Sequence, residues 1–295
     1  MGLFDAFKKK ECSICGGEIG LLGNRKLEDG NMCKNCAAKL SPWFSERRSS
    51  TVEEIKAQLD YREANKEKVA AFRTTRTLGE TVKVLLDEDA GKFMVTSARD
   101  LAEANPDVLD FADVTGCTLD IDEDRTEIQY KDAEGNRKSF TPKRYAYSYD
   151  FTIVIHVNNT YFNEIRFQLN RSKVDNDEET LLDGPNAMPR PRTPARPMPG
   201  GARPGAMRPG MAPRAPMGGV RTSNADEVRA SVEYRQYEEM GNEIRDALLQ
   251  VRQEVRANAA AAAAPRQAVT CPWCGATTTP DASGCCEYCG GSVNG

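Results

Sequence analysis

The sequence predicts an α+β protein in which an antiparallel sheet and several helices lie between two small cysteine-rich modules. Three observations lead to this fold class. Apolar and polar residues alternate between residues 81 and 170, apolar residues recur every three or four positions in the helical segments, and eight of ten cysteines form Cys-x-x-Cys pairs near the two ends. Strands with almost no helix between them favour an antiparallel sheet over a parallel one.

The paired cysteines have the spacing of tetrahedral metal sites. The N-terminal set is Cys12, Cys15, Cys33 and Cys36, and its two pairs are separated by the segment 16–32. The C-terminal set is Cys271, Cys274, Cys286 and Cys289, and its pairs are separated by the segment 275–285. A Cys-x-x-Cys turn supplies two thiolates, and two such turns complete a structural Zn²⁺ site without an open position for a catalytic water. Redox-active or merely buried cysteines are the alternative, but two independent duplicated pairs favour two structural zinc ions.

Two cysteines remain outside these sets. Cys285 is adjacent to Cys286, but only Cys286 leaves a two-residue gap before Cys289. Cys117 lies in an alternating strand pattern, which favours a buried, unreactive thiol.

Composition and periodicity divide the chain into six segments. Ten of the sixteen prolines lie between Pro185 and Pro216, as expected of a linker outside a packed core. The expected segments are a zinc finger (1–40), a helical connector (41–80), an antiparallel β domain (81–183), a disordered Pro/Arg/Gly/Met linker (184–222), an amphipathic helix (223–264) and a zinc ribbon (265–295).

Local signals define the elements of the N-terminal third. Asp29-Gly30 predicts a hairpin turn before the second cysteine pair, which then opens a short helix. This order of knuckle, hairpin and helix resembles a treble-clef finger. Thr51 and Glu54 have the spacing of a capping box for a helix in the connector, and a second helical run ends at Gly79.

The β domain is expected to contain about six strands in a meander, built as a curved sheet or a small barrel. The strand patterns cover residues 82–86, 93–95, 115–121, 128–130, 147–157 and 165–169. A helix from about 225 to 258 could cover one end of this domain or pair with a second copy, and periodicity leaves both open. Gly241 is a weak point in that helix because of its low helix propensity.

Charge and composition restrict the function. The net charge is −4, yet residues 184–221 carry seven arginines and no acid. That arm contains no aromatic residue for base stacking, so a solvated spacer is favoured over a nucleic-acid groove. His156 is the only histidine, which removes most histidine-based catalytic schemes and indicates a protein that is not an enzyme.

The sequence also suggests a location. It contains no apolar run long enough to span a membrane as a helix and no secretory leader, so a cytoplasmic protein with reduced thiols is expected. Residues 1–10 combine Leu and Phe with three lysines and could contact a membrane surface weakly, although packing on the finger is equally compatible.

The segment 1–80 resembles an uncharacterised bacterial domain family, a domain of unknown function with an N-terminal four-cysteine finger. The matching stretches are Cys12-Ser13-Ile14-Cys15-Gly16-Gly17, Leu27-Glu28-Asp29-Gly30, Cys33-Lys34-Asn35-Cys36 and Ser41-Pro42-Trp43-Phe44 into Thr51-Val52-Glu53-Glu54-Ile55. The sheet with its later helix resembles a bacterial pleckstrin-homology-like fold, from which the long arm departs. The C-terminal end, from Cys271 onward, is similar to short terminal zinc ribbons of bacterial proteins, which commonly serve as interaction modules.

These features favour a non-enzymatic cytoplasmic adaptor or scaffold that binds zinc and protein partners. A nucleic-acid-binding regulator that uses the zinc ribbons and the arginine-rich arm is the alternative. A thiol oxidoreductase would need Cys117 or Cys285 as its reactive thiol. The sequence indicates neither the partner nor the oligomeric state.

Overall fold

The computed structural model describes residues 10–20, 22–176, 179–186, 224–263, 268–281 and 283–293. The chain divides into two compact units, Met1–Leu249 and Gln250–Gly295, and each is described by itself. Most of the expected linker and almost all of the expected membrane-contact segment lie outside the described residues.

The first unit begins with the finger, which consists of two small hairpins and a short helix. Its elements are β1 (Lys10–Glu11), β2 (Glu18–Ile19), β3 (Arg25–Lys26), β4 (Asn31–Met32) and α1 (Lys34–Ala37). Strand β1 pairs with β2, and β3 pairs with β4, both antiparallel. The order of a knuckle, a hairpin and a helix agrees with the order expected from the sequence.

Helix α2 (Val52–Ala71) follows a 3-10 turn, η2 (Glu46–Ser49), and completes the finger core. Thr51 Oγ1 accepts a hydrogen bond from the Glu54 N–H, and Glu54 Oε2 accepts one from the Thr51 N–H, so the expected capping box is present. Ile55 in the first turns is fully buried. It shares a core with residues from the finger, namely Cys12, Ile19, Leu27, Met32, Cys36 and Leu40.

The second half of α2 packs on a four-stranded antiparallel sheet. The strands are β5 (Arg76–Leu78), β6 (Lys83–Asp87), β7 (Lys92–Thr96) and β8 (Leu109–Asp110), in the order β5-β6-β7-β8. A short helix, α3 (Leu101–Ala104), and a 3-10 turn, η3 (Phe111–Asp113), accompany β8. Val69 of α2 contacts a buried cluster that includes Leu85, Met94 and Val108. Helix α2 therefore joins the finger to the first sheet.

A buried ion pair lies beside this junction. Arg62 Nη1 donates to Asp107 Oδ1 at 2.8 Å, and both side chains are almost inaccessible to solvent. Ser41 Oγ donates to the other carboxylate oxygen, and Arg62 Nε reaches the carbonyl of Lys39. Burial raises the pKa of Asp107, although Arg62 and Ser41 act in the opposite direction. The pair links α2 to the end of the finger and to the loop before β8.

Asn65 extends this polar contact by one helical turn. Its Nδ2 donates to Asn105 Oδ1 and to the Pro106 carbonyl, while its Oδ1 accepts from the Val108 N–H. Asn105 Nδ2 in turn donates to the Arg62 carbonyl at 2.7 Å. These bonds satisfy polar groups that are buried away from water. They fix the loop before β8 against α2, because moving the loop would leave those groups without hydrogen-bond partners.

The second sheet is organised by two long strands, β9 (Val114–Lys131) and β10 (Arg137–Val157). They pair antiparallel, with Ile155 opposite Cys117 and with a register shift between Ser139 and Arg144. The sheet also contains β11 (Glu164–Gln168) and β12 (Val174–Asp175) against β10, and β13 (Leu181–Asp183) parallel to β9. The strands expected at 115–121 and 128–130 are thus one continuous strand. Within the described residues, neither sheet closes into a barrel.

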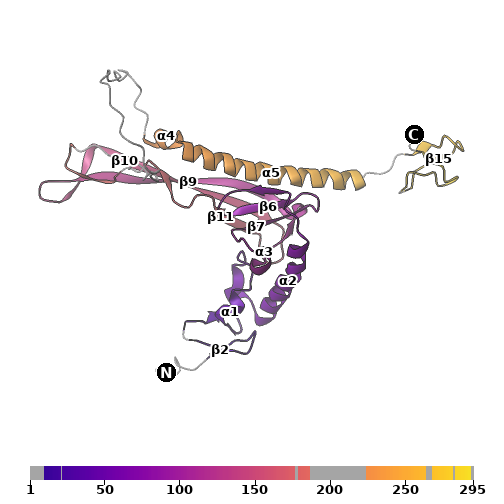
Figure 1. Cartoon of the computed structure of the whole chain (residues 1–295), viewed down its shortest axis with the longest axis horizontal. Helices are drawn as coiled ribbons and strands as arrows, with labels where there is room; N and C mark the ends of the chain where they lie inside the picture. Colours follow the sequence, from indigo (N-terminus) through magenta and orange to yellow (C-terminus); the bar gives the residue numbers. More distant parts are fainter. Residues whose placement is uncertain are drawn as a thin grey trace, which may run out of the picture. The chain divides into compact units, whose positions relative to one another are not determined.

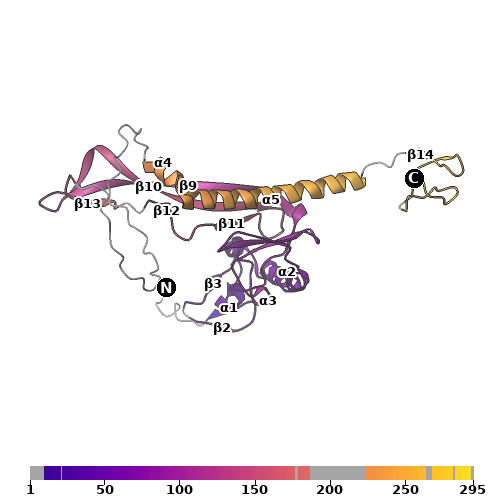
Figure 2. The same ribbon diagram turned by 45° about the horizontal axis from the view of Figure 1, so that its top comes forward.

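Helices α4 (Asn224–Arg229) and α5 (Val232–Ala263) follow the linker. Up to Leu249, α5 lies along β9 and β10 in both views (Figure 1, Figure 2). The ring of Tyr234 lies with its centroid 5.0 Å from those of Tyr149 and Phe151, and Ile244 and Leu248 are fully buried. The amphipathic helix therefore covers the sheet of its own chain, one of the two possibilities that periodicity left open.

The second unit contains the end of α5 and a ribbon with β14 (Val269–Thr270) and β15 (Thr277–Thr278), which pair antiparallel. In the part of the chain that the structure describes, no helix combines the length and apolarity needed to cross a bilayer.

Candidate metal centres

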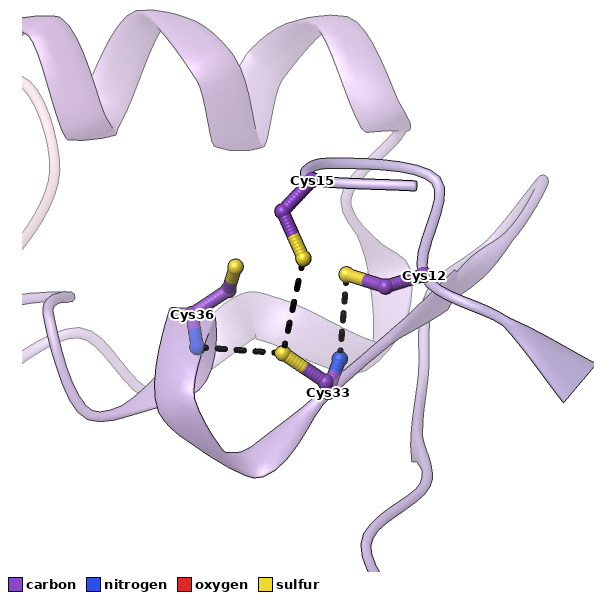
Figure 3. Close-up of side chains that lie close together, drawn as sticks. All are labelled: Cys12, Cys15, Cys33 and Cys36. Carbon is purple, nitrogen blue, oxygen red and sulfur yellow. Dashed lines mark hydrogen bonds between the residues drawn. The ribbon is translucent and has the colours of Figure 1, made fainter. Parts of the chain in front are cut away.

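The four N-terminal cysteines converge from two separate turns of the finger (Figure 3). Cys12 and Cys15 lie in the turn between β1 and β2. Cys33 is the N-cap of α1, and Cys36 lies inside that helix. All four Sγ atoms lie within 4.8 Å of one another. Cys12 and Cys36 are buried in the finger core, so the cluster is continuous with the apolar interior.

The C-terminal cysteines form a second cluster of the same kind. Cys271 and Cys274 lie in the turn between β14 and β15, and Cys286 and Cys289 lie in the following turn. Their four Sγ atoms also lie within 4.8 Å of one another. The structure therefore brings together both predicted sets of ligands.

The sulfur separations fit a tetrahedral zinc ion. With Zn–S bonds near about 2.3 Å, neighbouring sulfurs of a tetrahedron are about 3.8 Å apart. The observed separations are 3.9 Å for Cys15 and Cys33, 3.6 Å for Cys271 and Cys289, and 3.7 Å for Cys274 and Cys286. A disulfide requires about 2.0 Å, so these are non-bonded thiols at ligand distances. The two groups are consistent with two structural zinc ions, each with four protein ligands.

Three of the knuckles share one backbone pattern. In the first, the Cys12 N–H donates to the Gly17 carbonyl and the Gly16 N–H donates to the Cys12 carbonyl. Cys271 and Cys286 make the same two bonds with the residues four and five positions later. The fifth residue of each turn is a glycine with φ between 69° and 72°, namely Gly16, Gly275 and Gly290. This left-handed backbone explains why glycine directly follows the second cysteine of each knuckle.

Electrostatics favour a cation in the N-terminal cluster. Burial opposes ionisation of Cys12, but hydrogen bonds from the backbone N–H groups of Cys15 and Cys33 outweigh it and lower the Cys12 pKa to about 6. The pKa of Cys36 is raised, first by burial and then by hydrogen bonds with the neighbouring thiols. The backbone can thus stabilise one thiolate, and further thiolates require a positive charge, which Zn²⁺ supplies when bound.

The ribbon cluster repeats this asymmetry. Burial acts against the Cys286 thiolate, but backbone donors at Cys289 and Tyr288 lower its pKa to about 7. At Cys289 the backbone of Gly291 acts to lower the pKa, yet contacts with Cys274 and Cys271 outweigh it and raise the pKa to about 12. The chemistry of both donor sets therefore fits a divalent, thiophilic metal ion.

The remaining cysteines and the histidine stand apart from both clusters. Cys285 is partly buried, and its Sγ donates to the Ser283 carbonyl at 3.8 Å rather than joining the four thiols. Cys117 is buried in β9, and burial raises its pKa to about 12. His156 is exposed on β10, with its Nδ1 4.0 Å from Glu164 Oε2.

Two aromatic side chains beside the ribbon ligands were missed by the sequence analysis. Trp273 and Tyr288 occupy the same position in the two knuckles, directly before the second cysteine, and are 75% and 71% exposed. Trp273 Nε1 donates to the Ser292 carbonyl at 3.0 Å, and its ring covers Gly291 closely enough that a Cβ there would lie 2.7 Å from Cδ1. The available signal was an aromatic residue at a matched position in each knuckle.

Comparison with known proteins gives a match only for the segment that contains the N-terminal cysteine cluster. The model of a domain of unknown function, DUF4428, matches residues 10–58. No curated protein and no solved structure matches the chain at a significant level. The matched segment includes the four N-terminal cysteines and the first turns of α2, including Ile55, which completes the finger core. The finger and the start of α2 thus form the domain, and the comparison supplies no activity for it.

Proposed function

We propose that the protein is a non-enzymatic zinc-binding adaptor or scaffold that presents surfaces to protein partners. The observation that carries this proposal is the pair of exposed aromatic side chains on the ribbon, Trp273 and Tyr288. Large aromatic side chains held in fixed positions are the residues that most often dominate the binding energy of protein interfaces.

The ribbon supports such a role through its rigidity. The Trp273 ring has little freedom, because it packs on Gly291 and donates to the Ser292 carbonyl. A partner that covers a fixed ring loses little side-chain entropy. The four cysteines of each cluster supply every ligand of a tetrahedral ion, so zinc would brace these turns and leave no position for substrate.

The test compares partner capture by the zinc-loaded full chain with capture by the double variant Trp273→Ser/Tyr288→Ser. We expect one defined set of cytosolic proteins to bind the wild type, and the identified partner to lose about 30-fold or more in affinity with the variant. Glu287→Gln, at an exposed position in the same knuckle, is the matched control and should bind as the wild type does. Equal binding by all three proteins, each with two zinc ions, would refute the proposal.

A nucleic-acid-binding regulator remains the second candidate. The ribbon aromatics could stack on bases, and the seven arginines of the arm, which lie outside the described residues, could neutralise phosphates. Binding to single-stranded DNA or RNA that weakens steeply with salt and disappears when the seven arm arginines are neutralised would favour this role over the adaptor.

Two further parts of the proposal concern the β domain and the location. A pleckstrin-homology-like relationship is supported by an antiparallel sheet and a second, mainly antiparallel sheet, followed by a helix that covers the second one. An experimental structure of the zinc-loaded chain would test it.

Cytoplasmic location is supported by ten cysteines without a disulfide among the described residues, and localisation of a tagged full-length protein would test it.

A further inference from the structure

A strongly basic cleft lies on the finger. It has a volume of about 820 Å³ and is lined by residues from β3, from the chain on either side of β3 and from η2, namely Asn24, Arg25, Lys26, Leu27, Glu28, Arg47 and Arg48. Four cations and a single carboxylate therefore line one cleft, in a chain whose net charge is −4. Such a local excess of positive charge is unfavourable unless an anion offsets it.

The four cations have no ionic partner within the described residues. None of them forms an ion pair with a carboxylate there, and none hydrogen-bonds to a cysteine sulfur of the metal cluster. Burial, followed by the charges of Arg48 and Arg25, lowers the pKa of Arg47. Repulsion from these two neighbouring guanidinium groups therefore adds to the larger effect of burial on the Arg47 pKa. Lys26 and Arg48 are exposed and free to meet a ligand.

Two of the arginines are held in position by backbone carbonyls. Arg47 Nη1 donates to the Lys26 carbonyl at 2.6 Å, and Arg25 Nη1 donates to the carbonyls of Leu22 and Asn24 at 3.3 and 3.2 Å. A guanidinium has five N–H donors, so each arginine keeps donors for a ligand while its orientation is fixed. Fixed guanidinium groups recognise phosphate and carboxylate oxygens through paired hydrogen bonds.

We infer that this cleft binds a phosphorylated peptide segment of a partner protein. A phosphomonoester carries nearly two negative charges and three acceptor oxygens. It therefore matches three arginines and a lysine better than a ligand with a single carboxylate would. Clusters of arginines are a recurring means of recognising phosphorylated peptides.

A nucleic acid fits the same cleft less well. No aromatic residue is among the side chains that line it, so bases have no stacking partner there. The segment from 81 to 183 of the same chain contains 22 acidic and 12 basic residues, and this excess of negative charge would repel a long polyanion. A short peptide can meet the cleft alone and avoid that repulsion.

The experiment measures fluorescence anisotropy of a labelled peptide with one phosphoserine, mixed with the zinc-loaded full chain. The same peptide with serine or glutamate in place of phosphoserine, and a short single-stranded oligothymidine, are the comparison probes. We expect the phosphopeptide to bind at least tenfold more tightly than the other three. Lys26→Gln/Arg48→Gln should weaken phosphopeptide binding about tenfold, because it removes two exposed charge contacts.

The matched control removes two exposed cations elsewhere, in Lys56→Gln/Arg99→Gln, and has the same net charge. It should change the affinity by less than twofold. Equal loss in both double variants, no binding by the phosphopeptide, or equal or tighter binding by the glutamate peptide or the oligothymidine would each overturn the inference. These measurements do not involve Trp273 or Tyr288, so they can succeed or fail independently of the adaptor test.

Discussion

Gly241 of α5 lies directly against Leu119 of β9. A Cβ at position 241 would come within 2.6 Å of Leu119 Cδ1 and within 3.1 Å of its Cγ. The sequence indicated Gly241 only as a weak point of the helix. The structure shows that the missing side chain allows the helix backbone to approach the sheet.

Gly241→Ala tests this contact through a double-mutant cycle. Alanine gains about 1 kcal/mol in helix propensity, but overpacking of a contact like this one costs about 1–3 kcal/mol. We therefore expect a net loss of unfolding free energy in the wild-type background. In Leu119→Ala the clash is absent, so the same substitution should stabilise by about 1 kcal/mol. Chemical denaturation of the four proteins gives the comparison, and equal effects in both backgrounds would show that the contact is unimportant.

Metal content gives the second prediction. The purified full chain should contain two zinc ions, and Cys36→Ser and Cys286→Ser should each contain one. Loss of the first ion should also expose Ile55, because the cluster and that side chain share a core. Elemental analysis measures the ions, and hydrogen exchange at the start of α2 reports the exposure. Cys285→Ser is the control and should keep both ions, so a loss of zinc from that variant would contradict the assigned ligands.

The metal clusters could be predicted because their rules are local. A Cys-x-x-Cys turn and the glycine after it specify the same backbone hydrogen bonds wherever they occur, as Gly16 and Gly275 show. The capping box of α2 depends equally on two residues three positions apart, Thr51 and Glu54. Such signals need no knowledge of the rest of the fold.

The strands were harder to predict from the sequence, because pairing with a distant strand can override the local polarity of a segment. The charged stretch between Ile121 and Ile128 predicts a turn, yet it continues β9 because β10 pairs with it throughout. There Tyr149 donates to Glu123 Oε2 at 2.9 Å, and Arg125 lies 4.4 Å from the ring of Tyr145. Cross-strand contacts of this kind stabilise polar strands but leave no periodicity in one strand alone.

The buried ion pair beside α2 gives the third prediction. Asp107→Ala leaves Arg62 buried without its carboxylate, which should cost about 3–5 kcal/mol of unfolding free energy. The double variant Arg62→Met/Asp107→Leu removes both charges. Its loss of unfolding free energy should be clearly smaller than the sum of the losses in Arg62→Met and Asp107→Leu. Glu63→Ala, which breaks the exposed contact with Lys66, is the control and should cost under about 1 kcal/mol. Additive losses for the buried pair would show that its two charges are not coupled.

Cys117 gives a prediction for the pH dependence of stability. Burial raises its pKa in the folded chain to about 12, while the thiol of an unfolded chain ionises near about 8.5. The unfolded state therefore loses this proton first as the pH rises, and the folded state loses relative stability above about pH 8.5. Below that pH both states keep the proton, so the thiol has no effect on the pH dependence.

Cys117→Ala removes this one titration and leaves the other groups in place. Between about pH 7.5 and 9.5 the unfolding free energy of the wild type should fall by about 1.4 kcal/mol more than that of the variant, because a single group contributes that amount per pH unit above its unfolded pKa. Denaturant titrations of the zinc-loaded proteins at both pH values measure the difference. Parallel changes in the two proteins would mean that Cys117 ionises as readily in the folded chain as in the unfolded one, and the thiol would then be accessible to oxidants and metal ions after all.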